Sequence, residues 1–142
     1  MRNSEIIEDK IAAYHSTHYC IQTKAGLITL KIGEYTSNLL TLFKSSSQQC
    51  GVVITAFNPY GKLIDHETNQ ATNKQLGEHL SSLSSMVLEA EGVDPLGIWP
   101  SEPSFFALGI NRDVARSLGV HYLQDAVVWI GADAVPELVL LR

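Results

Sequence analysis

A short run of apolar residues near the middle of the chain constrains the fold more than any other feature. Residues 50–57 lack the apolar–polar alternation of a half-buried strand, and Val52, Val53 and Ile54 follow one another directly. Such a run is typical of a strand that is covered on both faces. A turn-like break follows, and residues 65–83 then have the pattern of a long helix. We therefore expect residues 52–57 to form a central strand with this helix packed on the sheet.

The remaining patterns place short elements on both sides of this pair. Helix patterns cover residues 4–15, with Asn3 or Ser4 as the cap, and residues 36–44 and 112–118. Strand patterns cover residues 17–23, 27–32, 86–91, 105–110, 126–130 and 137–141. The resulting order, α-β-β-α-β-α-β-β-α-β-β, predicts an α/β (α+β) fold with a central mixed β-sheet flanked by helices. A chain of 142 residues has the length of one domain, so we expect residues 1–142 to form a single domain.

The charge balance narrows the classes of partner. Ten Lys and Arg against fifteen Asp and Glu give a net charge of −5, and the cations are scattered singly. Nucleic-acid backbones and anionic membranes both select a basic surface, so neither is an expected partner. The chain has no signal-peptide pattern, no apolar run of membrane-spanning length, and too few cysteines for a disulfide framework. These features predict a cytoplasmic location, and none of them indicates an oligomeric state.

The predicted long helix carries an anomaly on the face that should meet the core. One stripe of this helix contains Asn69, Asn73, Leu76, Leu80 and Leu83. The leucines suit a core-facing stripe, but the asparagines do not. Buried amides must form hydrogen bonds inside the protein or line a cleft. The asparagine end also lies near the end of the 52–57 strand, where open α/β sheets bind ligands.

Other polar residues flank the predicted strands at positions that meet this edge. If the strands beginning near residues 105 and 126 run antiparallel to the central strand, their starts lie beside its end. The cleft would then contain the acid/base candidates Glu67 and Glu102 and the ligand-binding candidates Thr55, Asn58, Asn69, Asn73, Ser104 and Gln124. Carboxylates and amides suit ligands with hydroxyl or amine groups. The sequence therefore predicts a site for a small polar or nucleotide-like ligand.

Two classes of function remain open from the sequence. In the first, Glu67 or Glu102 acts as acid or base on the bound ligand, because no cysteine, lysine or histidine lies in a nucleophile motif. In the second, the polar residues form a purely structural network and the protein is a non-catalytic interaction module. No residues have the spacing of metal ligands, and no motif identifies a cofactor. Whether the chain is an enzyme therefore stays open.

Several short patterns together resemble those of a known family. They are Ala13-Tyr14-x-x-Thr17-x-Tyr19, Thr55-Ala56-Phe57-Asn58-Pro59, Glu67-x-Asn69-x-x-x-Asn73-x-x-Leu76, Trp99-x-x-Glu102-Pro103-Ser104-Phe105 and Gln124-Asp125-Ala126. In this order they closely resemble a bacterial family of small proteins of unknown function, over about residues 13–129. The resemblance implies no activity, because none is established for the family. It implies only that the candidate residues named above are the positions that matter.

Overall fold

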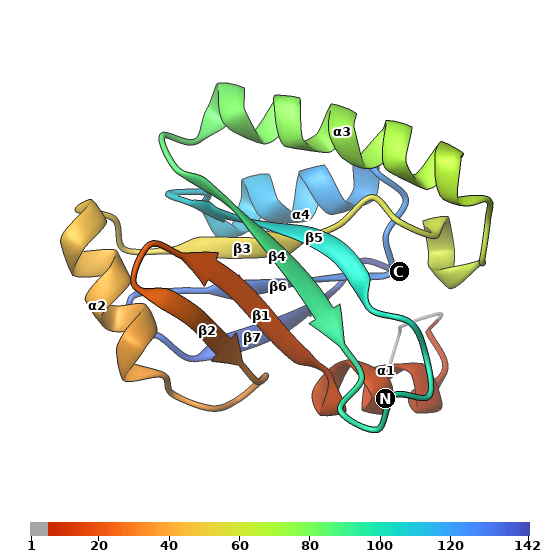
Figure 1. The fold of residues 1–142 in the computed structure, drawn as a ribbon, viewed down its shortest axis with the longest axis horizontal. Coiled ribbons are helices and arrows are strands. Elements are labelled where there is room, and N and C mark those ends of the chain that lie inside the picture. Colours follow the sequence, from red (N-terminus) through yellow and green to blue (C-terminus); the bar gives the residue numbers. More distant parts are fainter. Residues whose placement is uncertain (1–5) are drawn as a thin grey trace.

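The computed structural model describes residues 6–142 and has the predicted order of elements (Figure 1). The helices are α1 (Glu8–Ser16), α2 (Ser37–Ser46), α3 (His66–Leu83) and α4 (Arg112–His121), with a 3-10 turn η1 (Pro59–Gly61). The strands are β1 (His18–Thr23), β2 (Gly26–Leu30), β3 (Gly51–Ile54), β4 (Val87–Val93), β5 (Glu102–Leu108), β6 (Ala126–Ile130) and β7 (Pro136–Leu140). The predicted caps of the first helix, Asn3 and Ser4, lie outside the described residues. No helix within residues 6–142 is long and apolar enough to cross a membrane.

One seven-stranded sheet has the order β2-β1-β4-β5-β3-β6-β7, and every neighbouring pair in it is antiparallel. The prediction of a mixed sheet is therefore wrong. A strand–helix–strand connection often joins parallel neighbours. Here the connection through α3 passes over β5, and the connection through α4 passes over β3. The strand left between each connected pair runs in the opposite direction, so no parallel neighbours remain.

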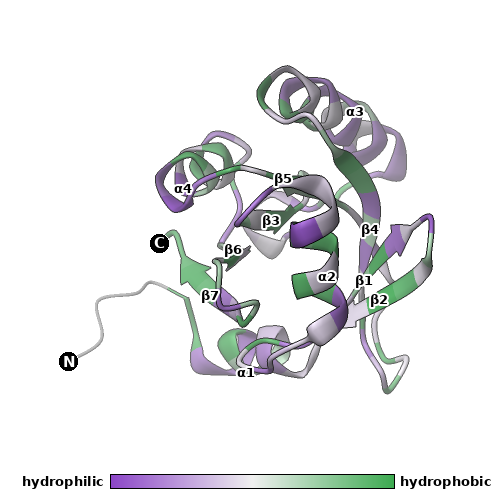
Figure 2. Ribbon diagram, turned by 90° about the vertical axis from the view of Figure 1, so that its left-hand side faces the viewer, coloured by the Kyte–Doolittle hydropathy of each residue, from purple (hydrophilic) through white to green (hydrophobic). Residues whose placement is uncertain are grey.

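The sheet curls into an arc that we call the half-barrel. Figure 2 shows the strands following this arc from β7 to β2, with α2 on its concave side and α3 and α4 outside it. Two backbone hydrogen bonds join the segment after β2 to the start of β7 and to the turn before it: Gly33 N donates to Pro136 O at 2.8 Å, and Thr36 N donates to Ala134 O at 3.3 Å. The helices α2 and α1 lie at opposite ends of the half-barrel (Figure 1).

Both faces of the half-barrel carry a hydrophobic core. Leu39 and Phe43 of α2 pack on the concave face together with Val53 of β3. Leu80 of α3 and Leu118 of α4 belong to a second cluster on the convex face. All the residues of β3 are buried between these two cores. The prediction of a central strand that is covered on both faces is confirmed.

The strand β3 is shorter than predicted. It ends at Ile54 rather than at Phe57, because the backbone N–H groups that follow bond to side chains of α3. Asn73 Oδ1 accepts from Ala56 N at 3.0 Å, and Asn69 Oδ1 accepts from Asn58 N at 2.8 Å. The two asparagines thus replace the ladder bonds that would have continued the strand.

The leucine stripe of α3 ends one turn earlier than predicted. Leu76 and Leu80 are fully buried, whereas 48% of the surface of Leu83 is exposed. Leu83 is the last residue of α3, and the chain leaves the helix at Ser84. The expectation that Leu83 packs in the core is therefore wrong, because the chain turns away before this side chain is covered.

Candidate functional site

Polar side chains that are distant in sequence converge on the segment after β3. Because β5 and β6 both run antiparallel to β3, their first residues lie beside its end. Asn58 Nδ2 donates to Glu102 Oε2 at 3.3 Å, and Gln124 Nε2 donates to the Phe57 carbonyl at 3.2 Å. Together with the asparagine bonds from α3, these contacts confirm the predicted proximity of Asn58, Asn69, Asn73, Glu102 and Gln124.

The two asparagines of α3 both hold this segment, Asn69 through its amide oxygen and nitrogen and Asn73 through its amide oxygen. Besides accepting from the backbone of Asn58, Asn69 donates through Nδ2 to Asn58 Oδ1 at 2.7 Å. Asn58 has a positive φ of 49°, a conformation that asparagine tolerates better than most residues. Asn69 and Asn73 are both buried. Their amides therefore supply the structural network that the sequence left as one of two alternatives.

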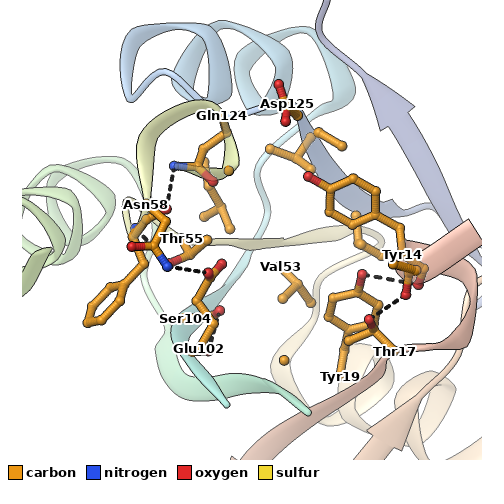
Figure 3. Close-up of a pocket in the computed structure, with 18 of the residues that line it drawn as sticks. Tyr14, Thr17, Tyr19, Val53, Thr55, Asn58, Glu102, Ser104, Gln124 and Asp125 are labelled. Atoms are coloured by element: carbon orange, nitrogen blue, oxygen red, sulfur yellow. Dashed lines mark hydrogen bonds between the residues drawn. The ribbon is translucent and has the colours of Figure 1, made fainter. Parts of the chain in front are cut away.

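A cavity of about 260 Å³ lies beside this network at the α1 end of the half-barrel (Figure 3). Its apolar wall includes Val53, Val128 and Leu138. Its polar wall includes Tyr14, Thr17, Thr55, Asn58, Glu102, Ser104 and Gln124. The mouths of curved sheets are common sites for small ligands. The cavity is therefore the candidate functional site.

Glu102 differs from the other two acidic side chains that line the cavity: Asp125 is ion-paired and Asp94 accepts from three backbone N–H groups, whereas Glu102 has neither kind of partner among residues 6–142. Only its Oε2 is bonded, to Asn58, and among residues 6–142 the carboxylate forms no ion pair. Burial raises the pKa of this carboxyl above its ordinary value, and the hydrogen bond from Asn58 offsets part of that increase. The free Oε1 can accept from a bound donor. Protonation of the same group would make it a donor.

Three residues face Glu102 across the cavity: Tyr14 of α1, Tyr19 of β1 and Thr17, which lies between these two elements (Figure 3). Tyr19 donates its hydroxyl to the Tyr14 carbonyl at 3.3 Å, and Thr17 donates its hydroxyl to the Ala13 carbonyl at 2.6 Å. The Tyr14 hydroxyl has no hydrogen-bond partner within the described part of the chain. Burial, followed by the carboxylates of Asp125 and Glu102, raises its pKa. The Tyr14 hydroxyl therefore stays protonated and free to bond a ligand.

A buried ion cluster closes one side of the cavity. Asp125, whose side chain is 1% exposed, pairs with Lys10 Nζ and with Arg142 Nη1, the latter at 2.7 Å. Lys10 Nζ also donates to the Tyr60 carbonyl at 3.0 Å, and the Arg142 guanidinium lies 4.1 Å from the centre of the Tyr60 ring. The cluster connects η1 to α1. The ammonium group of Lys10 is therefore bonded to Asp125 and to the backbone of η1.

The structure brings only part of the predicted site to the cavity. Thr55, Asn58, Glu102, Ser104 and Gln124 line it, and Asn69 and Asn73 do not. Glu67 is exposed on the first turn of α3 and does not line it either. The expectation that Glu67 and Glu102 share one cleft is therefore wrong. Glu67 precedes Asn69 by two positions, and this spacing turns its side chain about 200° around the helix, away from the network.

Sequence reasoning missed the tyrosine side of the cavity. Tyr14, Thr17 and Tyr19 entered only as part of a family-like pattern, and their side chains line the wall opposite Glu102. Their spacing carried a usable signal, because Thr17 and Tyr19 lie two apart at the start of a strand and share a face. Asp125 likewise entered only as part of a family-like pattern. It stands next to Gln124 but is buried by partners from both ends of the described chain.

The raised pKa of Glu102 predicts a pH dependence of stability. Between the ordinary glutamate pKa of about 4.3 and the raised folded value, the folded state binds a proton that the unfolded state releases. Stability should therefore fall as pH rises through this window. In Glu102→Gln the glutamine carbonyl can still accept from Asn58, but it does not titrate. Urea unfolding from pH 4 to 8 should show that the free energy of unfolding of this variant increases relative to that of the parent as pH rises. A variant about 1 kcal/mol less stable at pH 7 would instead indicate a structural, charge-assisted bond.

The comparisons with known proteins identify a family but no activity. A family model described as "Protein of unknown function (DUF3293)" matches residues 54–127, which is more than half of the chain. The matched segment runs from the end of β3 into β6 and contains the polar network and Glu102. No curated protein and no solved structure matches the chain. The chain belongs to the DUF3293 family.

Proposed function

We propose that this protein binds a small polar ligand in the cavity at the α1 end of the half-barrel. The observation that carries the proposal is the Glu102 carboxylate, which faces the cavity with one oxygen unbonded and with no cation of the described chain beside it. A partly buried carboxylate is unfavourable unless a partner compensates for its lost hydration. A ligand that bonds this carboxylate would supply that compensation.

The size and lining of the cavity support a small ligand. Ligand pockets in proteins are commonly about 300–1,000 Å³ and combine apolar walls with few polar groups. The cavity, at about 260 Å³, is just below the lower end of that range. It combines the aliphatic wall of Val53, Val128 and Leu138 with the carboxylate of Glu102 and the hydroxyl of Tyr14. This supports a ligand of metabolite size, and we propose that the protein meets it in a bacterial cytoplasm.

Glu102 is also the group best placed to act as an acid or base on such a ligand. A raised pKa brings a carboxyl closer to neutrality, where proton transfer in either direction is efficient. The Tyr14 hydroxyl, on the opposite wall, can hold the ligand in place as a neutral donor. Glu67 has no part in this proposal, because it does not line the cavity.

An interaction module remains the second candidate function, and one surface feature favours it. The loop between β4 and β5 exposes Leu96, Ile98 and Trp99, which are 79%, 69% and 57% exposed. The Asp94 carboxylate shapes this loop by accepting from the backbone N–H groups of Leu96, Ile98 and Trp99. Exposed apolar residues held in a fixed loop are typical of contact surfaces.

A thermal-shift screen of small polar metabolites tests ligand binding directly. A compound that binds the folded state raises the melting temperature, and the stabilisation grows with the logarithm of one plus the ratio of its free concentration to Kd. Ala13 lines the cavity from α1, and its neighbour Ala12 is exposed and does not. We expect Ala13→Phe to abolish the shift of a cavity ligand by filling its space and Ala12→Phe to preserve it. A screen without hits, or hits that both variants retain equally, would contradict the proposal.

A further inference from the structure

We propose that the ligand of this cavity is a primary amine, with its ammonium group on the Glu102 carboxylate and a short apolar substituent against Leu63 and Trp99. The inference rests on the proposed function, since it names the ligand class of the same cavity. It is argued from the charges of the cavity wall, from the unused hydrogen-bonding atoms and from the residues at its mouth.

The charges of the cavity wall favour a cationic group at Glu102. This carboxylate is bonded only by the neutral amide of Asn58. Lys10 is the cavity-lining cation, but its ammonium is bonded to Asp125 and to the Tyr60 carbonyl. Arg142 is likewise paired with Asp125. The positive charges near the cavity are thus neutralising another carboxylate, and an incoming ammonium would supply what Glu102 lacks.

The unused hydrogen-bonding atoms fit an ammonium group. An ammonium carries three donors and no acceptor. Glu102 Oε1 and the Tyr14 hydroxyl oxygen are both free to accept among the described residues. Both side chains extend into the cavity from opposite walls (Figure 3). The hydroxyls of Thr17, Thr55 and Ser104 already donate to backbone carbonyls, so these groups have no hydrogen left to donate to an acceptor on the ligand. Charge-assisted bonds of the carboxylate–ammonium type are among the strongest available to a small ligand.

The mouth of the cavity favours an apolar substituent on that amine. Leu63 and Trp99 both line the cavity, yet they are 84% and 57% exposed. They come from two different loops, the one after η1 and the one before β5. An apolar chain that extends from Glu102 towards solvent would cover both side chains. Each buried methylene should tighten binding by about fourfold.

The test is isothermal titration calorimetry of the full chain with hexylamine, hexan-1-ol and hexanoate at pH 7.5. These probes share one chain and differ only in the head group. We expect hexylamine to bind at least tenfold more tightly than the other two, because its ammonium group is the positively charged partner that the Glu102 carboxylate lacks. Butylamine should bind more weakly than hexylamine, and ethylamine more weakly still. Glu102→Gln should lower the affinity for hexylamine at least tenfold, whereas Glu67→Gln, which alters an exposed glutamate outside the cavity, should not.

The outcomes separate this inference from the proposed function. Tighter binding of hexan-1-ol or hexanoate would overturn the amine assignment and leave the cavity as a ligand site. The same conclusion would follow if no alkyl probe bound but the metabolite screen gave a hit that Ala13→Phe abolished. If neither the probes nor the screen gave a cavity ligand, both the inference and the proposed function would fail. Equal losses in the Glu102 and Glu67 variants would also overturn the amine assignment.

Discussion

Replacing Leu80 by alanine should lower the free energy of unfolding by about 2–5 kcal/mol, the range for truncating a core leucine. Leu80 is fully buried on α3, in the cluster that also contains Val52 and Ile54 of β3. The truncation would leave a cavity between the helix and the convex face of the sheet. Urea or thermal unfolding of the parent and the variant measures the difference.

Leu83 provides the matched control on the same helix. It belongs to the same sequence stripe, but 48% of its surface is exposed. Leu83→Ala should therefore change the free energy of unfolding by less than about 1 kcal/mol. Similar losses for the two variants would mean that α3 does not pack on the sheet as described.

Replacing Asn73 by leucine should destabilise the protein by about 1–3 kcal/mol, although leucine suits a buried helix face. Asn73 Oδ1 is the acceptor for the backbone N–H of Ala56, and both residues are buried. Leucine would leave that N–H without a partner and away from water. The cost is that of an unsatisfied donor rather than of lost volume, because the two side chains have similar sizes.

Gln75→Leu separates this effect from a general effect of leucine on α3. Gln75 is exposed two residues further along the helix, so its replacement should shift stability by no more than about 0.5 kcal/mol. Equilibrium urea unfolding of both variants makes the comparison. An Asn73→Leu variant as stable as the parent would show that the amide does not hold the segment after β3.

Much of the fold could be predicted because its signals are local. The apolar run around Val52 and the helical stripe through Leu80 follow from periodicity alone. The order of the elements is a sum of such signals. The direction of neighbouring strands is not local, because it depends on which strand each connection passes over. The all-antiparallel sheet could therefore not be predicted from the sequence, and the order of elements even favoured parallel pairs.

The polar network could be predicted for a different reason. Asn69 and Asn73 stand on a face that should be apolar, and this conflict pointed to hydrogen-bond partners nearby. The sequence could not say whether those partners were a ligand or the chain itself. The structure gives the answer for these two residues, since their amides bond to residues 56 and 58.

The tyrosine wall of the cavity could not be predicted, because its position depends on the curvature of the sheet. Tyr14 and Glu102 are far apart in sequence and meet only because the half-barrel brings β1 and α1 opposite the start of β5. The hydrophobic periodicity of a sequence does not indicate that two such distant residues lie across a cavity from each other. Glu102 was found because it precedes the strand predicted to begin at residue 105, and that strand was assumed to run antiparallel to the central strand. The residues around Tyr14 in the sequence give no sign that its side chain faces the Glu102 carboxylate.

A crystal structure of the protein with a hit from the metabolite screen would test the proposed function most directly. The account predicts electron density for the compound in the cavity at the α1 end of the half-barrel, with a polar atom within hydrogen-bonding distance of Glu102 Oε1. The asparagine bonds from α3 to the segment after β3 should be unchanged. Density for the compound only on the outer surface, with the cavity and Glu102 untouched, would contradict the account.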